Sequence, residues 1–305
     1  MKILISHKLE KGSIGGMTRF HENLINGFSN YYPDVRFTYD RNCTNYDILF
    51  ILTPTSIDSF DFIDNAKKLG KKIVLRIDNL CKPSRNKRYR PFEKMVRLAT
   101  LADQVIYQSD WARTYIAWGK MPSKGTVILN GVNEDIFKKE GEARDLTGGK
   151  AYGDIFLVLT SSSDPCKRLH ESLAIFEHEY RKASEGGTKP VKLIVAGRLP
   201  DEYHVRKMQS NWDFVRGEES EYIGELHSSQ EVARVMRGCT QLLFPSFNDA
   251  APNTVLEARA CGLNTLISLS GGSPQMNSIP LHKIGLSYMC TNYYQEFDKL
   301  LNNKW

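Results

Sequence analysis

Residues 244–262 read FPSFNDAAPNTVLEARACG, and they predict the end of a strand, a loop and then a helix. Pro252 suits the first turn of a helix, and Gly262 is typical of the residue that follows one. Asn253 or Thr254 is expected to cap the unpaired N–H groups at the start of the helix. This stretch is therefore one strand-to-helix unit of an α/β protein.

The same alternation of short apolar runs and helical patterns extends over the whole chain. Strands are predicted at residues 2–7, 46–52, 72–77, 104–108, 127–129, 155–160, 192–196, 222–223, 241–244 and 265–268. Helices are predicted at residues 17–30, 56–69, 91–102, 111–118, 168–183, 229–237 and 253–261. Strands that alternate with helices indicate parallel sheets joined by right-handed crossovers.

The alternation stops at residues 138–154, which are polar and contain several glycines. Single hydrophobic cores stop growing near about 250–300 residues, so a chain of 305 residues favours two domains. We predict two Rossmann-like domains, residues 1–140 and 151–290, whose parallel sheets face each other across a cleft. A helix in residues 291–305 is expected to pack back on the first domain.

The composition excludes several classes of protein. Hydrophobic residues make up 41% and charged residues 25%, as in ordinary folded chains. No apolar run approaches the about 20 residues of a membrane helix, and the N-terminal run is too short for a signal peptide. The six cysteines form no CxxC pair, which argues against a zinc or redox site. We expect buried thiols in a cytoplasmic protein, within the host cytoplasm if the gene is viral.

Two features of the sequence suit an anionic ligand that carries hydroxyl groups. Asp249 lies in the loop of the opening stretch, and Glu257 lies about one turn into its helix, on a face that can look back toward the loop. A loop and helix start of this kind can bind a diphosphate through backbone N–H groups, which leaves both carboxylates for sugar hydroxyls. Gly15 and Gly16 precede another helix and permit close backbone approach. The alternatives are ordinary surface carboxylates and a purely structural glycine turn.

The spacing of Asp249 and Glu257, followed by LEARACG, resembles the acidic-x7-Glu motif of the retaining GT-B glycosyltransferases, in particular family 4 (glycosyl transferases group 1). That family usually has Glu at both ends of the motif. Other pieces are similar in order and spacing: Gly15–Gly16, 103-DQVIYQSDWAR-113, 130-NGVNEDIF-137, 161-SSSDPCKR-168, 224-GEL-226 and 271-GGSPQ-275. The resemblance covers most of the chain, and the short length is similar to that of phage-encoded members.

The resemblance implies a GT-B fold whose C-terminal domain binds a nucleotide-sugar, most often a UDP-sugar. It implies that Glu257 holds the ribose hydroxyls, that Asp249 contacts the transferred sugar, and that Gly15 and Gly16 approach the donor phosphate. The loop around the phosphates and the sugar would be Ala250, Ala251, Pro252, Asn253 and Thr254.

The resemblance also implies a phosphate clamp at Lys167 and Arg168, with Ser161 where a common family version has an arginine. Two cations there would neutralise the leaving diphosphate. The alternative is a solvated first helical turn, although cations at a helix N-terminus oppose its dipole. A DxD metal motif is absent, so we expect no metal and no other cofactor. Retention would follow from attack on the face that the diphosphate leaves.

The positive charge is concentrated in residues 66–98, which hold twelve Lys and Arg against two acids. The segment carries +10 and the rest −4, within a net charge of +6. Because the family reads its acceptor with the N-terminal domain, acceptor contacts are expected from Arg76, Lys82, Arg85, Lys87, Arg88, Tyr89 and Arg90. Asp78 stands where the family often has a histidine, so we expect it to contact the acceptor hydroxyl or act as a base. His21 is the less favoured substitute.

The acceptor has three alternatives. A basic loop can follow nucleic acid phosphates, dock on anionic lipid headgroups or stay solvated. Nucleic acid is favoured, because no amphipathic helix with Trp or Phe accompanies the cations. The sugar acceptor in DNA would be a hydroxymethylated pyrimidine such as 5-hydroxymethylcytosine, flipped out of the duplex.

The predicted function is sugar transfer from a nucleotide-sugar to this acceptor with retention. A glycan or lipid acceptor and a non-catalytic nucleotide- or nucleic-acid-binding relative are the alternatives, and a Rossmann oxidoreductase is disfavoured by the missing GxGxxG. The oligomeric state is left open.

Overall fold

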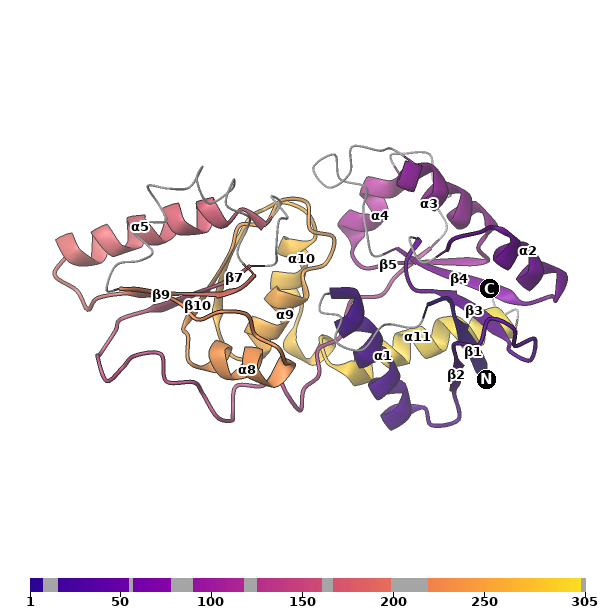
Figure 1. The fold of residues 1–305 in the computed structure, drawn as a ribbon, viewed down its shortest axis with the longest axis horizontal. Coiled ribbons are helices and arrows are strands. Elements are labelled where there is room, and N and C mark those ends of the chain that lie inside the picture. Colours follow the sequence, from indigo (N-terminus) through magenta and orange to yellow (C-terminus); the bar gives the residue numbers. More distant parts are fainter. Residues whose placement is uncertain are drawn as a thin grey trace. The chain divides into compact units, whose positions relative to one another are not determined.

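The computed structural model describes residues 1–7, 16–54, 57–77, 90–117, 125–160, 167–198 and 219–302. The chain forms two compact α/β units (Figure 1). The N-terminal unit comprises Met1–Asn133 and Ile279–Trp305, and the C-terminal unit comprises Glu134–Ser278. The domain boundaries expected from the sequence were residues 140, 151 and 290. The structure instead assigns residues 134–140 to the C-terminal unit and residues 279–290 to the N-terminal unit.

The sheet of the N-terminal unit has six parallel strands in the order β2-β1-β3-β4-β5-β6. They are β1 (Lys2–Ile5), β2 (Arg36–Thr38), β3 (Ile48–Ile51), β4 (Lys72–Ile77), β5 (Gln104–Tyr107) and β6 (Thr126–Val127). The helices are α1 (Gly16–Tyr31), α2 (Asp61–Lys68), α3 (Arg90–Leu101), α4 (Asp110–Ala117) and α11 (Leu286–Leu301), with the short 3₁₀ helix η3 (Leu281–Lys283). In Figure 1, α2, α3 and α4 lie on one face of this sheet, and α1 and α11 lie on the other.

Helices cover both faces of the sheet because its central strands are apolar along their whole length. Every residue of β3 and β5 is buried, and in the register of the sheet Leu49 lies between Leu4 and Ile73. Strands of this kind are typical of parallel sheets covered on both sides. The predicted parallel architecture of this unit is therefore confirmed.

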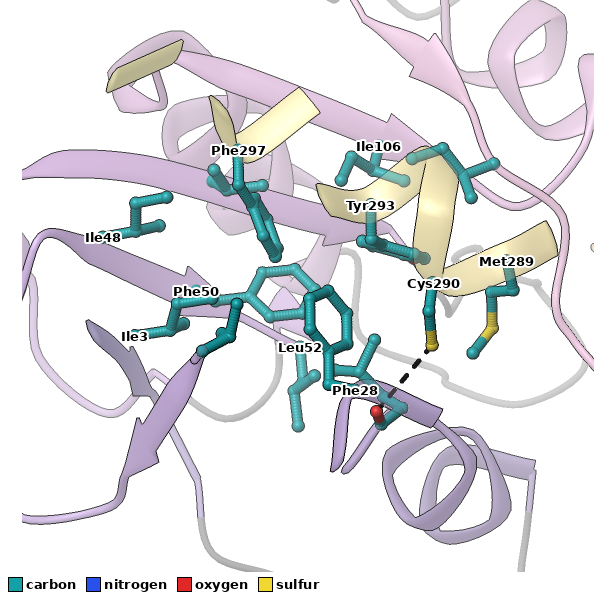
Figure 2. Close-up of a cluster of buried hydrophobic side chains, with 14 of the residues drawn as sticks. Ile3, Phe28, Ile48, Phe50, Leu52, Ile106, Met289, Cys290, Tyr293 and Phe297 are labelled. Atoms are coloured by element: carbon teal, nitrogen blue, oxygen red, sulfur yellow. Dashed lines mark hydrogen bonds between the residues drawn. The ribbon is translucent and has the colours of Figure 1, made fainter. Parts of the chain in front are cut away.

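The C-terminal helix α11 is part of the N-terminal core. Figure 2 shows Phe50 from the sheet and Phe28 from α1 packed with Tyr293 and Phe297 from α11. The two helices lie so close that a Cβ atom at Gly27 of α1 would stand 2.4 Å from the Cys290 sulfur.

A buried carboxylate also fixes α11 against the edge of the sheet. Glu296 accepts hydrogen bonds from Gln104 at 2.5 Å and from Thr126 at 3.0 Å, and it pairs with Lys299 at 3.0 Å. Because buried carboxylates need such partners, this cluster determines where the helix sits on β5 and β6.

The C-terminal unit has five parallel strands in the order β11-β10-β7-β8-β9. They are β7 (Ile155–Thr160), β8 (Lys192–Gly197), β9 (Ser220–Tyr222), β10 (Gln241–Phe244) and β11 (Asn264–Ile267). Its helices are α5 (Leu169–Glu185), α8 (Ser229–Arg237), α9 (Asn253–Ala260) and α10 (Ser273–Ser278). Helix α5 lies on one face of the sheet, and α8 and α9 lie on the other (Figure 1).

The segment predicted as an interdomain connection is anchored to the C-terminal unit. Residues 138–154 contain no helix or strand. Arg237 of α8 donates hydrogen bonds to the carbonyls of Ile136 at 3.1 Å and Glu142 at 2.8 Å, and Arg144 N–H donates to Arg234 at 2.9 Å. The segment is therefore held along α8.

The described helices include none with the length and apolar character needed to cross a membrane. The described cysteines Cys239, Cys261 and Cys290 are free and buried, while Cys43 is partly exposed.

Candidate functional site

The loops at the carboxyl edge of the C-terminal sheet bring two predicted site residues together. Lys167 directly precedes Arg168, the N-cap residue of α5, and Asp249 lies in the loop between β10 and α9. The Lys167 ammonium lies 2.7 Å from the Asp249 carboxylate, and the two side chains are 23% and 19% exposed. The ammonium also lies 4.9 Å from the ring centre of Phe244, at the end of β10. An ion pair so shielded from water interacts more strongly than one on the open surface.

The loop that carries Asp249 is held in place by the loop that follows β11. Asn248 N–H donates to the Ser270 hydroxyl at 2.9 Å, and that hydroxyl donates to the Asn248 side-chain oxygen at 2.9 Å. Gly272 N–H donates to the Asp249 carbonyl at 2.7 Å. Gly271 has a left-handed φ of 71°, and a Cβ there would lie 2.4 Å from the Asp249 carbonyl oxygen. The two glycines of the 271–275 motif therefore position the Asp249 backbone.

Two residues at this edge have an unfavourable backbone conformation. Arg168, with φ of 53°, and Asn248, with φ of 52°, are the non-glycine residues with positive φ in the described parts of the chain. Each is the neighbour in sequence of one member of the Lys167–Asp249 pair. Left-handed non-glycine residues cost on the order of 1–3 kcal/mol and cluster at functional sites. The strained backbone of Arg168 and Asn248 therefore lies at the same position as the ion pair.

The predicted clamp residue Arg168 is engaged within the chain. Its Nε pairs with the Glu171 carboxylate one turn into α5, and its guanidinium lies 5.9 Å from the centre of the Phe247 ring. Phe247 is half-exposed in the same loop as Asp249. Neither Glu171 nor Phe247 was singled out from the sequence. The three-residue spacing of Arg168 and Glu171 was an available signal for their pairing.

The second carboxylate of the motif, Glu257, is buried in α9 with 2% exposure. It is therefore not an ordinary surface carboxylate. The backbone at the start of α9 differs from the prediction, because Pro252 is the N-cap residue and its side chain makes no capping hydrogen bond. Ala250, Ala251 and Pro252 are buried, Asn253 and Thr254 form the first turn, and Gly262 follows the helix with φ of 88°, as predicted.

In the N-terminal unit, Arg76 lies below the surface with 1% exposure. Its guanidinium donates to the Leu52 carbonyl at 3.3 Å and to the Asn130 side-chain oxygen at 3.2 Å. The Phe20 ring covers it at 3.5 Å. Arg76 was predicted to contact the acceptor at the end of its strand, and the structure shows that its side chain is enclosed there.

His21 of α1 is paired within the N-terminal unit. It is 9% exposed, and its Nε2 lies 2.7 Å from the Tyr39 hydroxyl, with the two rings edge to face. Burial lowers the pKa of His21 below its ordinary value, and the charge of His7 lowers it further. Burial also raises the pKa of Tyr39. His21 therefore favours its neutral form.

Comparison with known proteins gives similarity at the level of the whole fold. Neither a protein-family model nor a curated protein matches the chain. Anabaena HepE, in complex with UDP and glucose, has a TM-score of 0.65 and 14% identity over 99% of this chain and 98% of that one. Sucrose-phosphate synthase of Thermosynechococcus elongatus has a TM-score of 0.59 and 14% identity over 94% and 72%. The lipopolysaccharide outer core galactosyltransferase WaaB, in its apo form, has a TM-score of 0.59 and 16% identity over 100% of this chain and 91% of that one.

The chain has the GT-B fold. Similarity at these identities shows the fold alone, and it confirms the predicted class of two Rossmann-like domains with parallel sheets. In parallel α/β sheets, ligands bind at the carboxyl ends of the strands. Both Asp249 and Lys167 lie at such an edge of the C-terminal unit of this GT-B chain.

Several predicted residues of the GT-B chain lie outside the described residues: Gly15, Asp78, Lys82, Arg85, Lys87, Arg88, Tyr89 and Ser161. Gly16 is the first residue of α1, and Arg90 is the first residue of α3. No three His, Cys, Asp or Glu side chains within the described ranges lie together in a group that could hold a metal ion.

Proposed function

We propose that this chain is a glycosyltransferase that moves a sugar from a nucleoside-diphosphate sugar to an acceptor hydroxyl. The observation that carries the proposal is the ion pair of Lys167 and Asp249 at the carboxyl edge of the C-terminal sheet. Each member is next in sequence to a residue with left-handed backbone, Arg168 or Asn248. A cation for phosphate and a carboxylate for sugar hydroxyls stand 2.7 Å apart there. A nucleoside-diphosphate sugar offers both groups next to each other.

The donor site follows from the chemistry of these groups. Lys167 and Arg168 neutralise the diphosphate, and the positive end of the α9 helix dipole at Asn253 favours it further. Asp249 accepts hydrogen bonds from hydroxyls of the transferred sugar, and Glu257 accepts them from the ribose. HepE binds UDP and UDP-glucose, which supports a UDP-sugar as the donor here.

In the transfer step, the bond from the anomeric carbon to the diphosphate oxygen breaks, and its electron pair stays on that oxygen. The acceptor oxygen bonds to the anomeric carbon from the same face, so the configuration is retained. The acceptor proton passes to Asp78 or to the departing diphosphate. Because Lys167 and Arg168 balance the charge that develops on the diphosphate, the proposed mechanism needs no metal ion.

Two observations favour different acceptors. The +10 charge of residues 66–98 favours an anionic acceptor, and hydroxymethylated pyrimidine in DNA is the candidate that the sequence analysis prefers. The activity named for WaaB, a galactosyltransferase of the lipopolysaccharide outer core, favours a glycan or lipid-linked acceptor instead.

The test of the transferase function is nucleotide release from UDP-sugars and GDP-sugars, with and without acceptors, followed by mass spectrometry of the products. Hydroxymethylcytosine DNA, hydroxymethyluracil DNA, oligosaccharides and glycolipids form the acceptor panel. We expect release that depends on Asp249 and Glu257 and is lost in Asp249→Asn and Glu257→Gln. Glu179→Gln, on the outer part of α5, is the matched control and should retain full activity. Release that persists in both site variants would refute the proposal.

A further inference from the structure

Arg76 is a cation enclosed in the N-terminal unit, with no ionic partner among the residues that the structure describes. An arginine side chain stays protonated in proteins, and burial of a charge is costly unless an opposite charge balances it. In the part of the chain that the structure describes, the recorded contacts of Arg76 are the Leu52 carbonyl, the Asn130 amide oxygen and the Phe20 ring. None is a carboxylate. The Arg76 Nε atom is buried without a hydrogen-bond acceptor.

The neutral partners of Arg76 continue into a network across the sheet. The Asn130 side-chain amide donates to the Gln108 side-chain oxygen at 3.0 Å, and the Gln108 amide donates to the Ile77 carbonyl at 3.0 Å. Leu52, Ile77 and Gln108 lie at the carboxyl ends of β3, β4 and β5, and Asn130 follows β6. The network thus joins four neighbouring strands at their carboxyl edge, and it surrounds the charge with dipoles that do not neutralise it.

We infer that the carboxyl edge of the N-terminal sheet is an anion site whose positive charge is Arg76. This edge is where parallel α/β sheets bind ligands. A unit charge about 8 Å from a bound anion, at an effective dielectric constant of about 20, changes the affinity for that anion roughly thirtyfold. Since the Nη atoms and one face of Arg76 are already occupied, Arg76 acts as a positioning residue. Its guanidinium holds the Asn130 side chain by a hydrogen bond, and its positive charge attracts the bound anion.

The inference rests on the proposed function in one respect, the source of the anion. The cations proposed to neutralise the donor diphosphate, Lys167 and Arg168, both lie in the C-terminal unit, so we assign the anion at the N-terminal edge to the acceptor. Its chemical class is a phosphate group. A residue that only clamps the strands together would serve neutral and anionic ligands equally, whereas the positive charge of Arg76 favours anionic ligands over neutral ones.

The experiment titrates the full-length chain with inorganic phosphate in the presence of saturating UDP and 150 mM NaCl (on the order of physiological ionic strength). Binding is followed by calorimetry. We expect phosphate to bind the wild type with UDP in place, because the proposed diphosphate contacts Lys167 and Arg168 lie in the C-terminal unit. Arg76→Met should weaken phosphate binding at least tenfold, and Arg76→Lys, which keeps the charge, should retain it within about threefold.

The matched control is Arg181→Met. Arg181 is exposed on α5 of the C-terminal unit, where it pairs with Glu177 at 2.6 Å, and it lies outside the basic segment 66–98. Its removal should leave phosphate binding unchanged. Circular dichroism melting shows whether each variant is folded, and Arg76→Gln, which can still hydrogen bond to Leu52 and Asn130, is the second neutral variant if Arg76→Met unfolds.

Three results would overturn the inference: no phosphate binding by the wild type, equal binding by the wild type and the neutral variants, or equal losses in the lysine and methionine variants. A loss of UDP affinity in Arg76→Met would assign the anion to the donor and overturn the acceptor assignment. If UDP fails to bind the wild type while Arg76-dependent phosphate binding is intact, the proposed function is refuted and the anion site stands.

Discussion

The Lys167 ammonium and the Asp249 carboxylate lie 2.7 Å apart, although 82 positions separate them in the sequence. Each stands beside a residue with left-handed backbone, and the loop of Asp249 is hydrogen bonded to the loop after β11. A donor diphosphate would take over the Lys167 charge and leave the Asp249 oxygens for sugar hydroxyls. The pair therefore keeps both groups oriented in the absence of ligand.

The first prediction separates the stability of this pair from its function. Lys167→Met should lower the free energy of unfolding by about 1–2 kcal/mol, because the partly buried Asp249 loses its counter-charge. It should also reduce the turnover of nucleotide-sugar about 100-fold or more. The double variant Lys167→Met with Asp249→Asn should regain most of the lost stability and none of the activity. Urea unfolding and nucleotide release are the two measurements, and a double variant with wild-type turnover would contradict the assigned roles.

The second prediction concerns the left-handed backbone of Arg168. Arg168→Gly and Arg168→Ala both remove the guanidinium, but only glycine adopts φ of 53° without strain. The glycine variant should therefore be more stable than the alanine variant by about 1 kcal/mol, measured by urea unfolding. Both should bind UDP more weakly than the wild type. A glycine variant that binds UDP as the wild type does would show that the Arg168 side chain has no part in the clamp.

Much of the fold could be predicted from the sequence because its central strands are continuous apolar runs. The strands at residues 72–77, 155–160 and 241–244 lie where they were predicted. Strand β2 was missed because its three residues are exposed or half-buried, so no apolar run marks them. Helix α10 was missed because its sequence, SPQMNS, has no apolar period.

The candidate site could be predicted only residue by residue. Asp249 and Lys167 were assigned from a resemblance, but their contact depends on the order of the strands and not on any local pattern. The role of Ser270 was missed for the same reason, since its partner Asn248 is on another loop. The left-handed backbone of Arg168 was not foreseen, because arginine has no preference for that conformation. The burial of Arg76 was missed because a charged residue at a strand end usually faces water.

A third prediction compares two glycines that share a left-handed backbone. Gly271 has φ of 71°, and a Cβ there would lie 2.4 Å from the Asp249 carbonyl oxygen and 2.7 Å from its nitrogen. Gly149 has φ of 83°, with no atom within 4 Å of the position of a Cβ. Gly149→Ala should cost about 1 kcal/mol from backbone strain alone. Gly271→Ala should cost more, about 2–4 kcal/mol, and should also lower turnover because it displaces Asp249. Equal losses of stability, or an active Gly271→Ala enzyme, would show that Gly271 does not hold this loop.

The fourth prediction is a pH dependence of stability that originates at His21. Burial lowers the pKa of His21 in the folded chain below the ordinary value of 6.5 that it regains on unfolding. The unfolded state therefore binds the proton more readily, and the free energy of unfolding should fall as the pH decreases below about 6.5. His7 lies close enough to add repulsion when it is protonated, and Tyr39 is the hydrogen-bond partner. His21→Gln should be less stable than the wild type at pH 7.5 and should lose less stability between pH 7.5 and 5.5. Urea unfolding at both pH values measures this, with His178→Gln on the exposed side of α5 as the control. An unchanged pH slope in His21→Gln would mean that the acid sensitivity comes from another group.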